Sequence, residues 1–147
     1  MTEPALTAPI FATLTVSAVE HDTRNSVTVT LETDGDNRFR FAHGQHLTFR
    51  RMFDDIEIRR SYSICAPSPD GQLRVGIKRV EGGVFSTWAT TELEAGVELD
   101  VMTPTGHFTH DLVSTSARRY ALVAAGSGIT PVYSIAATIL AEEPASV

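Results

Sequence analysis

Residues 26–32 read SVTVTLE and residues 73–78 read LRVGIK. In both stretches apolar side chains alternate with polar or small ones, which gives each stretch one apolar face, as is typical of a half-buried β-strand. Turn-forming clusters such as DGDN and SPDG separate these stretches from neighbouring segments of the same character. Short strands at this spacing predict a mainly β protein, built on a six-stranded closed antiparallel barrel. The other four strands are expected at residues 14–19, 46–49, 57–64 and 97–101.

One helix interrupts the strand pattern. It is expected to begin near Val84 and to end at about Leu93, because Phe85, Trp88 and Ala89 recur at helical spacing. We expect Trp88 to anchor this helix to the barrel.

The pattern changes after residue 104. Residues 121–140 read ALVAAGSGITPVYSIAATIL, an apolar run followed by a glycine turn and a helix with Pro131 near its first turn. A parallel strand and its crossover helix begin in this way. We therefore expect a complete barrel domain up to about Asp111, followed by the first strand and helix of an incomplete α/β domain.

Composition limits the class of protein. A chain of 147 residues suffices for one domain, or for one and part of a second. Twelve basic residues against eighteen acidic ones give a net charge of −6, which argues against binding nucleic acid or a membrane surface through bulk charge. A single cysteine, Cys65, and an N-terminus without the features of a signal peptide predict a cytoplasmic protein. We expect Cys65 to be a small core residue rather than a nucleophile.

The most informative motif is RRSYSI at residues 59–64. On a strand, alternation places Arg60 and Tyr62 on one face, and Ser61 and Ser63 on the other. An aromatic ring, a guanidinium and a hydroxyl this close together suit a flat heteroaromatic cofactor with a phosphate tail. The alternative is a structural strand with an exposed arginine and a core tyrosine.

A second motif is KRVEGGVFSTW at residues 78–88, where Gly82 and Gly83 precede the expected helix. Backbone N–H groups at the start of a helix favour an anion such as a phosphate, and Ser86 and Thr87 could add hydroxyl donors. The alternative is an ordinary glycine turn into a capped helix.

A third motif is AGSGITP at residues 125–131. A GxG turn between an apolar strand and a helix fits a dinucleotide diphosphate site, although Pro131 takes the place of the third glycine in the general fingerprint.

Two remaining groups are expected to be structural. The two HxxH pairs, at residues 43–46 and 107–110, do not favour a metal site, because positions three apart on a strand face opposite sides. Arg50 and Arg51 lie near acidic residues and are expected to belong to a solvated hairpin; the alternative is a contact on the adenine side of a bound cofactor.

Taken in order, the motifs RSYS, KRVEGGVFSTW, PTGHF and GSGITP resemble the ferredoxin–NADP reductase superfamily across almost the whole chain. The resemblance implies a Greek-key barrel that binds FAD at residues 8–111, and the start of an NAD(P)H-binding domain at residues 118–147. It implies that Arg60 contacts the flavin diphosphate, that Tyr62 stacks on the isoalloxazine, and that Ser63 lies near flavin N5, so that Tyr62 and Ser63 act in catalysis.

The same resemblance implies three further groups of cofactor-binding residues. They are Ile77, Lys78 and Val80 at the ribose and adenine of FAD; Gly83, Phe85, Ser86 and Thr87 at its diphosphate; and Gly126, Gly128, Thr130 and Pro131 at NAD(P)H.

Within the superfamily, the sequences of the motifs are most similar to those of reductase subunits of oxygenase systems, including the phenylacetyl-CoA epoxidase system. This implies a flavin-dependent oxidoreductase that takes hydride from NAD(P)H onto FAD. It would pass single electrons to an iron–sulfur centre, a ferredoxin-type acceptor or an oxygenase, in the degradation of phenylacetate or other aromatic compounds. A 2Fe–2S cluster would belong to a further domain, because one cysteine cannot supply four thiolates. The alternative is a non-enzymatic barrel module, or an inactive fragment that binds FAD or a partner protein without turnover.

Overall fold

The computed structural model describes residues 8–68 and 71–147. Within them six strands form one antiparallel sheet, and the expected mainly β class is confirmed. The strands are β1 (Phe11–Thr23), β2 (Ser26–Glu32), β3 (His46–Phe53), β4 (Ile56–Ser63), β5 (Leu73–Lys78) and β6 (Glu98–Met102).

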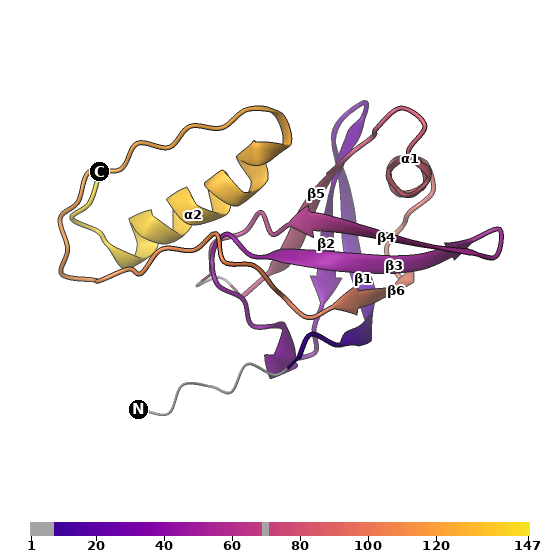
Figure 1. The fold of residues 1–147 in the computed structure, drawn as a ribbon, viewed down its shortest axis with the longest axis horizontal. Coiled ribbons are helices and arrows are strands. Elements are labelled where there is room, and N and C mark those ends of the chain that lie inside the picture. Colours follow the sequence, from indigo (N-terminus) through magenta and orange to yellow (C-terminus); the bar gives the residue numbers. More distant parts are fainter. Residues whose placement is uncertain (1–7, 69–70) are drawn as a thin grey trace.

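The strands follow the order β4-β3-β6-β1-β2-β5, and the sheet curls until its two edges meet (Figure 1). The edges join through one isolated bridge between Ile64 and Val75, beside which the Cys65 N–H donates to the Arg74 carbonyl at 2.8 Å. Strand β6 returns beside β3 after the β3–β4–β5 run, which is the Greek-key arrangement. The barrel is thus closed by a seam only one bridge long.

The alternation in the sequence sets the register of the barrel. Val27 pairs with Ile77 and Val29 with Val75, and these four side chains are almost wholly buried. Because side chains alternate between the faces of a strand, one register puts every apolar position of β2 and β5 inside. The barrel interior is accordingly apolar from end to end.

Helix α1 (Val84–Thr91) lies between β5 and β6 in the chain and packs against one side of the barrel (Figure 1). It ends two residues earlier than expected, where the Glu92 N–H still bonds to the Trp88 carbonyl at 2.8 Å. Trp88 is 8% exposed and meets Phe53 and Phe85 edge-on. The expectation that Trp88 anchors the helix is confirmed.

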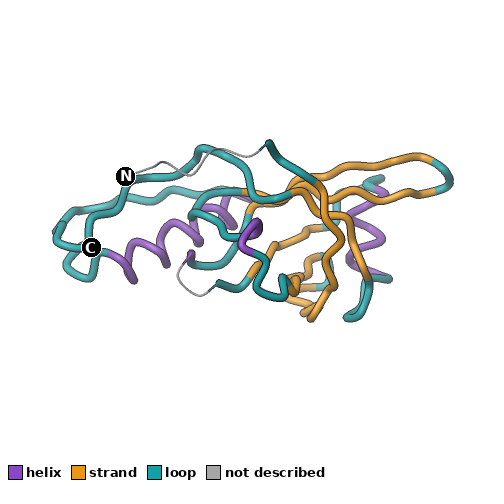
Figure 2. Tube along the Cα trace, turned by 90° about the horizontal axis from the view of Figure 1, so that it is seen from below, coloured by secondary structure: helices purple, strands orange, loops and turns teal. Residues whose placement is uncertain are grey.

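The C-terminal part is a long connection followed by helix α2 (Ile129–Glu142), which lies beside the barrel (Figures 1 and 2). The helix is as expected, but the strand expected at residues 121–125 is not formed. A strand needs a neighbouring strand for its ladder, and no strand of the described part lies beside this segment. Its start is held instead by the Tyr120 N–H to Val147 carbonyl bond (2.8 Å) and the Val147 N–H to Arg118 carbonyl bond (2.9 Å).

Hydroxyl groups dock α2 on the barrel. The Ser134 hydroxyl donates to the Ala66 carbonyl at 2.7 Å, and the Ser68 N–H donates to the Thr138 hydroxyl at 3.1 Å. At the first turn of the helix Thr130 lies so close to β5 that a Cβ on Gly76 would come within 3.1 Å of its methyl group. Neither α2 nor any other helix in the described ranges has the length and apolarity needed to cross a bilayer.

A buried carboxylate closes the C-terminal part. Glu143 is 0% exposed, and it accepts hydrogen bonds of 2.8 Å from the Val113 N–H, the Tyr120 hydroxyl and the Ser146 hydroxyl. The Arg118 guanidinium lies 3.5 Å away. The Val113 N–H first, and then the two hydroxyls and Arg118, outweigh the effect of burial and lower the pKa of Glu143 to about 2. The carboxylate is therefore ionised at neutral pH.

Candidate functional site

A cleft of about 1020 Å³ opens where the barrel seam meets the N-terminal end of α2. Residues of β1, β2, β4 and β5 line it on the barrel side, and five residues between Gly126 and Tyr133 line it on the other. The cleft brings together several residues that lie far apart in the sequence and that the motifs singled out: Tyr62, Ser63, Ile77, Lys78, Val80, Gly126 and Thr130.

Tyr62 is half-buried on the cleft wall. Its ring packs against Phe85 (centroids 5.9 Å apart, planes inclined by 32°) and meets Phe49 edge-on at 6.0 Å. Burial raises the pKa of the Tyr62 phenol, and the charge of Arg60 opposes this only in part. The cleft therefore has an aromatic wall that is neutral at physiological pH and fixed from behind.

Ser63 and Cys65 follow Tyr62 along the cleft, and both are half-buried. Burial raises the pKa of the Cys65 thiol above its ordinary value. Because the thiolate is the nucleophilic form, this environment favours the structural interpretation of Cys65, although its side chain borders the cleft rather than the core.

Arg60 is exposed on β4, and one of its guanidinium N–H groups donates to the Arg59 carbonyl at 2.7 Å. It does not line the cleft itself. Arg60 lies two residues before Tyr62 on the same strand, so that the two side chains start from the same face. An exposed guanidinium beside the cleft can reach a phosphate that extends out of it.

The turn before α1 is built around Ser86. The Ser86 hydroxyl is buried, accepts from the Val80 N–H at 3.0 Å and donates to the Gly83 carbonyl at 3.3 Å. Gly83 caps the helix without a side-chain bond, and a Cβ there would lie 2.6 Å from the Ser86 oxygen. The Ser86 hydroxyl thus holds the turn together, and the backbone N–H groups at residues 84–86, in the first turn of α1, are the donors that remain there for an anion.

Phe85 and Thr87 are placed differently from each other. Phe85 is 1% exposed, so its side chain belongs to the core behind Tyr62. Thr87 and Gly83 line a separate hollow of about 580 Å³ beside the β3–β4 hairpin. This hollow is a cavity separate from the large cleft.

The hairpin expected at Arg50 and Arg51 is formed by β3 and β4, but both arginines are half-buried rather than fully solvated. The Arg50 guanidinium pairs with Asp100 at 2.9 Å and lies 4.1 Å from the centre of the Phe11 ring. The Arg51 guanidinium lies 4.1 Å from the centre of the Trp88 ring. Both arginines are on β3, and their guanidinium groups pack on the faces of aromatic rings.

The glycine turn before α2 forms the other side of the cleft. Gly126 has a φ of +56°, and the Thr130 hydroxyl donates to the Ser127 carbonyl at 2.9 Å. Gly128 directly precedes α2 and Pro131 lies in its first turn, but neither lines the cleft. Of the four residues expected at NAD(P)H, the structure places Gly126 and Thr130 on the cleft wall, and the other two do not line it.

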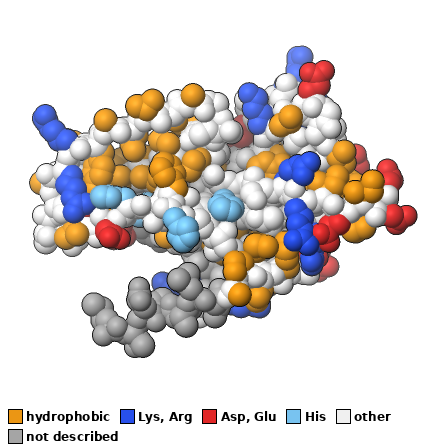
Figure 3. Space-filling model, viewed as in Figure 1, with side chains coloured by type: hydrophobic (Ala, Val, Ile, Leu, Met, Phe, Trp, Pro, Cys, Tyr) orange, Lys and Arg blue, Asp and Glu red, His pale blue; other side chains and the backbone are white. Residues whose placement is uncertain are grey.

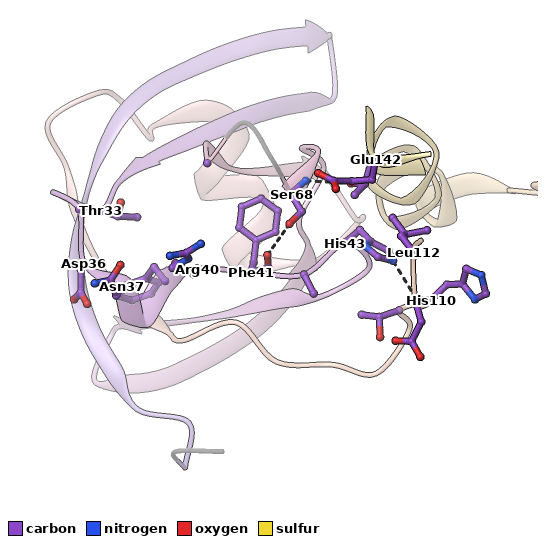
Figure 4. A pocket seen from close by; sticks show the side chains of 17 residues that line it. Thr33, Asp36, Asn37, Arg40, Phe41, His43, Ser68, His110, Leu112 and Glu142 are labelled. Atoms are coloured by element: carbon purple, nitrogen blue, oxygen red, sulfur yellow. Dashed lines mark hydrogen bonds between the residues drawn. The ribbon is translucent and has the colours of Figure 1, made fainter. Parts of the chain in front are cut away.

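Figure 4 shows a third hollow, of about 750 Å³, on another side of the molecule. None of the residues predicted for a cofactor lines it. Its polar groups serve the fold: the buried His43 ring accepts from the His110 N–H at 3.0 Å, and the Ser68 hydroxyl donates to the Phe41 carbonyl at 3.0 Å. Burial lowers the pKa of His43. Across the described ranges no three His, Cys, Asp or Glu side chains are grouped to hold a metal ion.

The motifs missed two apolar residues of the cleft, Ile129 and Tyr133. They lie four residues apart on α2: Ile129 belongs to the third motif but was given no role in it, and Tyr133 lies where the sequence pattern indicated only a helix. Two acidic residues of the barrel rim, Glu20 and Asp22, were missed as well. The Asp22 carboxylate accepts from the Thr28 hydroxyl at 2.8 Å.

The residues present fit a flavin. The cleft is as large as the larger small-molecule sites of proteins. It offers an aromatic wall at Tyr62, a hydroxyl at Ser63 and a cation nearby at Arg60. Gly76 and Gly126 have no side chain, so their backbone atoms form part of the cleft wall.

Comparison with known proteins agrees with this fit. The sequence model for the oxidoreductase FAD-binding domain matches residues 13–110. The chain therefore belongs to this family of flavin-binding oxidoreductase domains.

Two curated relatives are similar in sequence. A component of 1,2-phenylacetyl-CoA epoxidase from Escherichia coli (strain K12) is 44% identical over 138 residues, which cover 92% of this chain and 39% of the relative. The ferredoxin reductase component of 3-ketosteroid-9-alpha-monooxygenase from Mycobacterium tuberculosis (strain ATCC 25618 / H37Rv) is 38% identical over 107 residues, covering 71% and 29%. The chain thus spans about two fifths of the first relative and less of the second.

Solved structures are similar over most of the chain. The ferredoxin reductase in carbazole 1,9a-dioxygenase superposes with a TM-score of 0.76 at 25% identity, over 95% of this chain and 42% of that one. Phthalate dioxygenase reductase, described as a modular structure for electron transfer from pyridine nucleotides to [2Fe–2S], gives 0.75 at 27% identity, over 92% and 41%.

Proposed function

We propose that this chain is the FAD-binding part of an electron-transfer reductase, which receives hydride from NAD(P)H and delivers single electrons to an oxygenase or a ferredoxin-type partner. The observation that carries the proposal is the cleft itself, where Tyr62 and Ser63 of the barrel seam face the glycine turn at residues 126–130. The names of the two curated relatives, both components of oxygenase systems, support it. The higher identity to the epoxidase component favours phenylacetate degradation.

In this proposal each residue has a distinct part. Tyr62, fixed by Phe49 and Phe85, would hold the isoalloxazine in place, and Ser63 would offer a hydrogen bond near flavin N5. Arg60 and the backbone N–H groups at residues 84–86 would bind the diphosphate, with Ile77, Lys78 and Val80 near the adenosine. Bound FAD supplies the chemistry, since it accepts two electrons together and releases them singly.

On the other side, the turn at Gly126, Gly128, Thr130 and Pro131 would receive the pyridine nucleotide. We propose that residues 118–147 are the beginning of a dinucleotide-binding domain. Hydride transfer needs no general acid or base, so the task of these residues is to orient the two rings. A [2Fe–2S] centre would belong to a partner or to a further domain.

Titration of the purified chain with FAD tests the proposal. We expect a yellow complex, and Arg60→Ala should weaken it by about ten- to a hundredfold, because a charge-assisted hydrogen bond contributes about 1.5–3 kcal/mol. Arg59→Ala is the matched control, since the neighbouring Arg59 side chain pairs with Glu57 at 2.7 Å. A purified chain that is colourless and does not bind added FAD would overturn the flavin assignment. Equal losses of FAD affinity in Arg60→Ala and Arg59→Ala would overturn the role of Arg60.

Reduction of the bound FAD by NADH or NADPH tests turnover. Ser63→Ala should slow this reduction much more than it weakens FAD binding, because its hydrogen bond serves the reacting edge of the ring. FAD binding without any reduction by either nucleotide would support the alternative, a flavin-binding module that needs a further domain for its electron donor. The short span relative to the curated relatives is the reason to include this outcome.

A further inference from the structure

Two exposed apolar side chains of α2 line the cleft. Ile129 is 56% exposed and Tyr133 is 52% exposed. Residues four apart lie on the same face of a helix, so the two side chains form one continuous patch at the N-terminal end of α2. Large apolar groups at the wall of a cleft are a usual mark of a ligand-contacting surface.

The position of Tyr133 is fixed by its neighbours on the helix. Three residues before it, Thr130 contacts β5 at Gly76, and one residue after it, the Ser134 hydroxyl bonds to the Ala66 carbonyl at 2.7 Å. The backbone of Tyr133 is therefore held against both edges of the barrel seam. Its side chain starts from a defined point of the cleft wall, on the α2 side.

Tyr133 has no hydrogen-bonding or aromatic partner in the part of the chain that the structure describes. Within residues 8–68 and 71–147 its hydroxyl makes no hydrogen bond and its ring stacks on no other ring. Tyr62, the other tyrosine of the cleft, contacts Phe49 and Phe85. Tyr62 belongs to the barrel and Tyr133 to α2, so the cleft has one aromatic side chain on each of its two structural components.

We propose that Tyr133 is a second aromatic contact of the flavin, which meets the edge of the isoalloxazine from the α2 side while Tyr62 packs on one of its faces from the barrel, so that the other face stays open to the nicotinamide. This inference rests on the proposed binding of FAD. Ile129 extends the same apolar contact along the helix. The ring of Tyr133 provides the contact, and its hydroxyl is dispensable.

Binding of two flavins to the full chain tests the inference. The probes are FAD and lumiflavin, which has the same ring system and no phosphate. Tyr133→Ala should weaken both by roughly two- to tenfold, the range of one aromatic contact. Arg60→Ala should weaken FAD alone, because lumiflavin offers its guanidinium no phosphate. Tyr133→Phe should bind both flavins as the unmodified chain does.

A spectroscopic measurement separates direct contact from a general loss of structure. A tyrosine in contact with a flavin quenches its fluorescence, so the bound FAD should be brighter in Tyr133→Ala and unchanged in Tyr133→Phe. Leu140→Ala is the matched control, because Leu140 is an exposed apolar residue of the same helix that does not line the cleft. Tyr133→Leu, with a side chain suited to a helix, replaces the alanine variant if that variant unfolds.

The outcomes separate the role of Tyr133 from flavin binding as a whole. Failure of the unmodified chain to bind FAD would overturn the proposed function and, with it, this inference. FAD binding with unchanged affinity and fluorescence in Tyr133→Ala and Tyr133→Leu would overturn the inference and leave the proposed function standing.

Discussion

The barrel and the C-terminal part are held together by different means. The barrel surrounds a continuous apolar cluster, to which every strand contributes. In residues 112–147, four of the six buried side chains are polar: Ser134, Thr138, Glu143 and Ser146, beside Ile135 and Ile139. Apolar burial is non-directional and insensitive to pH, whereas hydroxyl and carboxylate contacts depend on geometry and protonation. The barrel should therefore be the robust unit and the C-terminal part the responsive one.

Figure 3 shows a difference in charge at the surface. Charged side chains are more frequent over the strands than over the half of the molecule where Figure 1 places α2, whereas apolar side chains are seen over both halves. Val123 is 91% exposed and Leu140 is 66% exposed. The C-terminal part thus buries more polar than apolar side chains, whereas the buried side chains of the barrel are mostly apolar.

The largest effect should come from the barrel core. Phe49 is 0% exposed and contacts Tyr62 and Phe85, so Phe49→Ala should lower the free energy of unfolding by about 3–5 kcal/mol. Denaturant unfolding followed by Trp88 fluorescence measures this. Met52→Ala on the same strand, at a side chain that is 54% exposed, is the control and should cost much less. A loss below about 1 kcal/mol for Phe49→Ala would remove the basis of the comparison.

The next effect should come from the contact between the two regions. Gly44 has a φ of +81°, and a Cβ there would lie 3.5 Å from the Ile135 side chain of α2 and would clash with the Phe108 carbonyl oxygen. Gly44→Ala should cost about 2–4 kcal/mol, the sum of an unfavourable backbone conformation and a steric clash.

Gly35→Ala is its matched control in the same denaturation experiment. Gly35 has a φ of +76° but open space around the missing Cβ, so its substitution should show the backbone cost alone. Equal losses for the two variants would mean that the chain near Phe108 moves away without cost.

A smaller, local effect is expected at Glu143. Glu143→Gln should weaken the protection of the Val113 and Val147 amides against hydrogen exchange and leave the barrel amides unchanged. Its exposed neighbour provides the control variant, Glu142→Gln. Loss of protection throughout the barrel would show that the two regions unfold as one unit.

The same carboxylate gives a pH dependence of known sign. The pKa of Glu143 is lowered to about 2 in the folded chain from an ordinary value of 4.5. Between these two pH values the carboxyl group binds a proton when the C-terminal part is unfolded and not when it is folded. The stabilisation is complete above about pH 4.5 and is lost as the pH falls toward 2. Protection factors of Val113 should follow this course in the unmodified chain and be flat in Glu143→Gln.

The smallest effect is expected at His43, whose pKa is lowered below its ordinary value of 6.5 by burial. The sign is the same as for Glu143, because protonation of His43 destroys the acceptor of the His110 N–H. Protection of the His110 amide should fall as the pH decreases below about 6.5, and His107→Asn, at an exposed neighbour, should not alter this. A pH-independent His110 amide would contradict the prediction.

The sequence predicted the barrel better than its surroundings for a physical reason. Alternation at Val27, Val29 and Leu31 reports directly on which face of a strand is buried, and the structure follows it. Docking through hydroxyls leaves no such trace, because Ser134 and Thr138 look like any polar residues of a helix. Nothing in the sequence distinguishes the buried Glu143 from the exposed Glu142 beside it.

The candidate site shows the same division. Tyr62 and Ser63 belong to a motif, and the structure places them on the cleft wall. Ile129 and Tyr133 were missed because an apolar helical run predicts burial, whereas these two side chains face the cleft. The strand expected at residues 121–125 failed for a related reason, since apolar residues indicate a buried strand only where a neighbouring strand completes it.

The one-bridge seam has a mechanical consequence. Helix α2 contacts both sides of the seam between Ile64 and Val75. Thr130 contacts β5, and Ser134 contacts the segment that follows β4. A tilt of the helix axis would move these two contact points unequally and so change the distance between the two sides of the seam. Any force on the chain beyond α2, including the pull of an attached protein, would therefore be transmitted as strain to the rim on which Tyr62 and Ser63 lie.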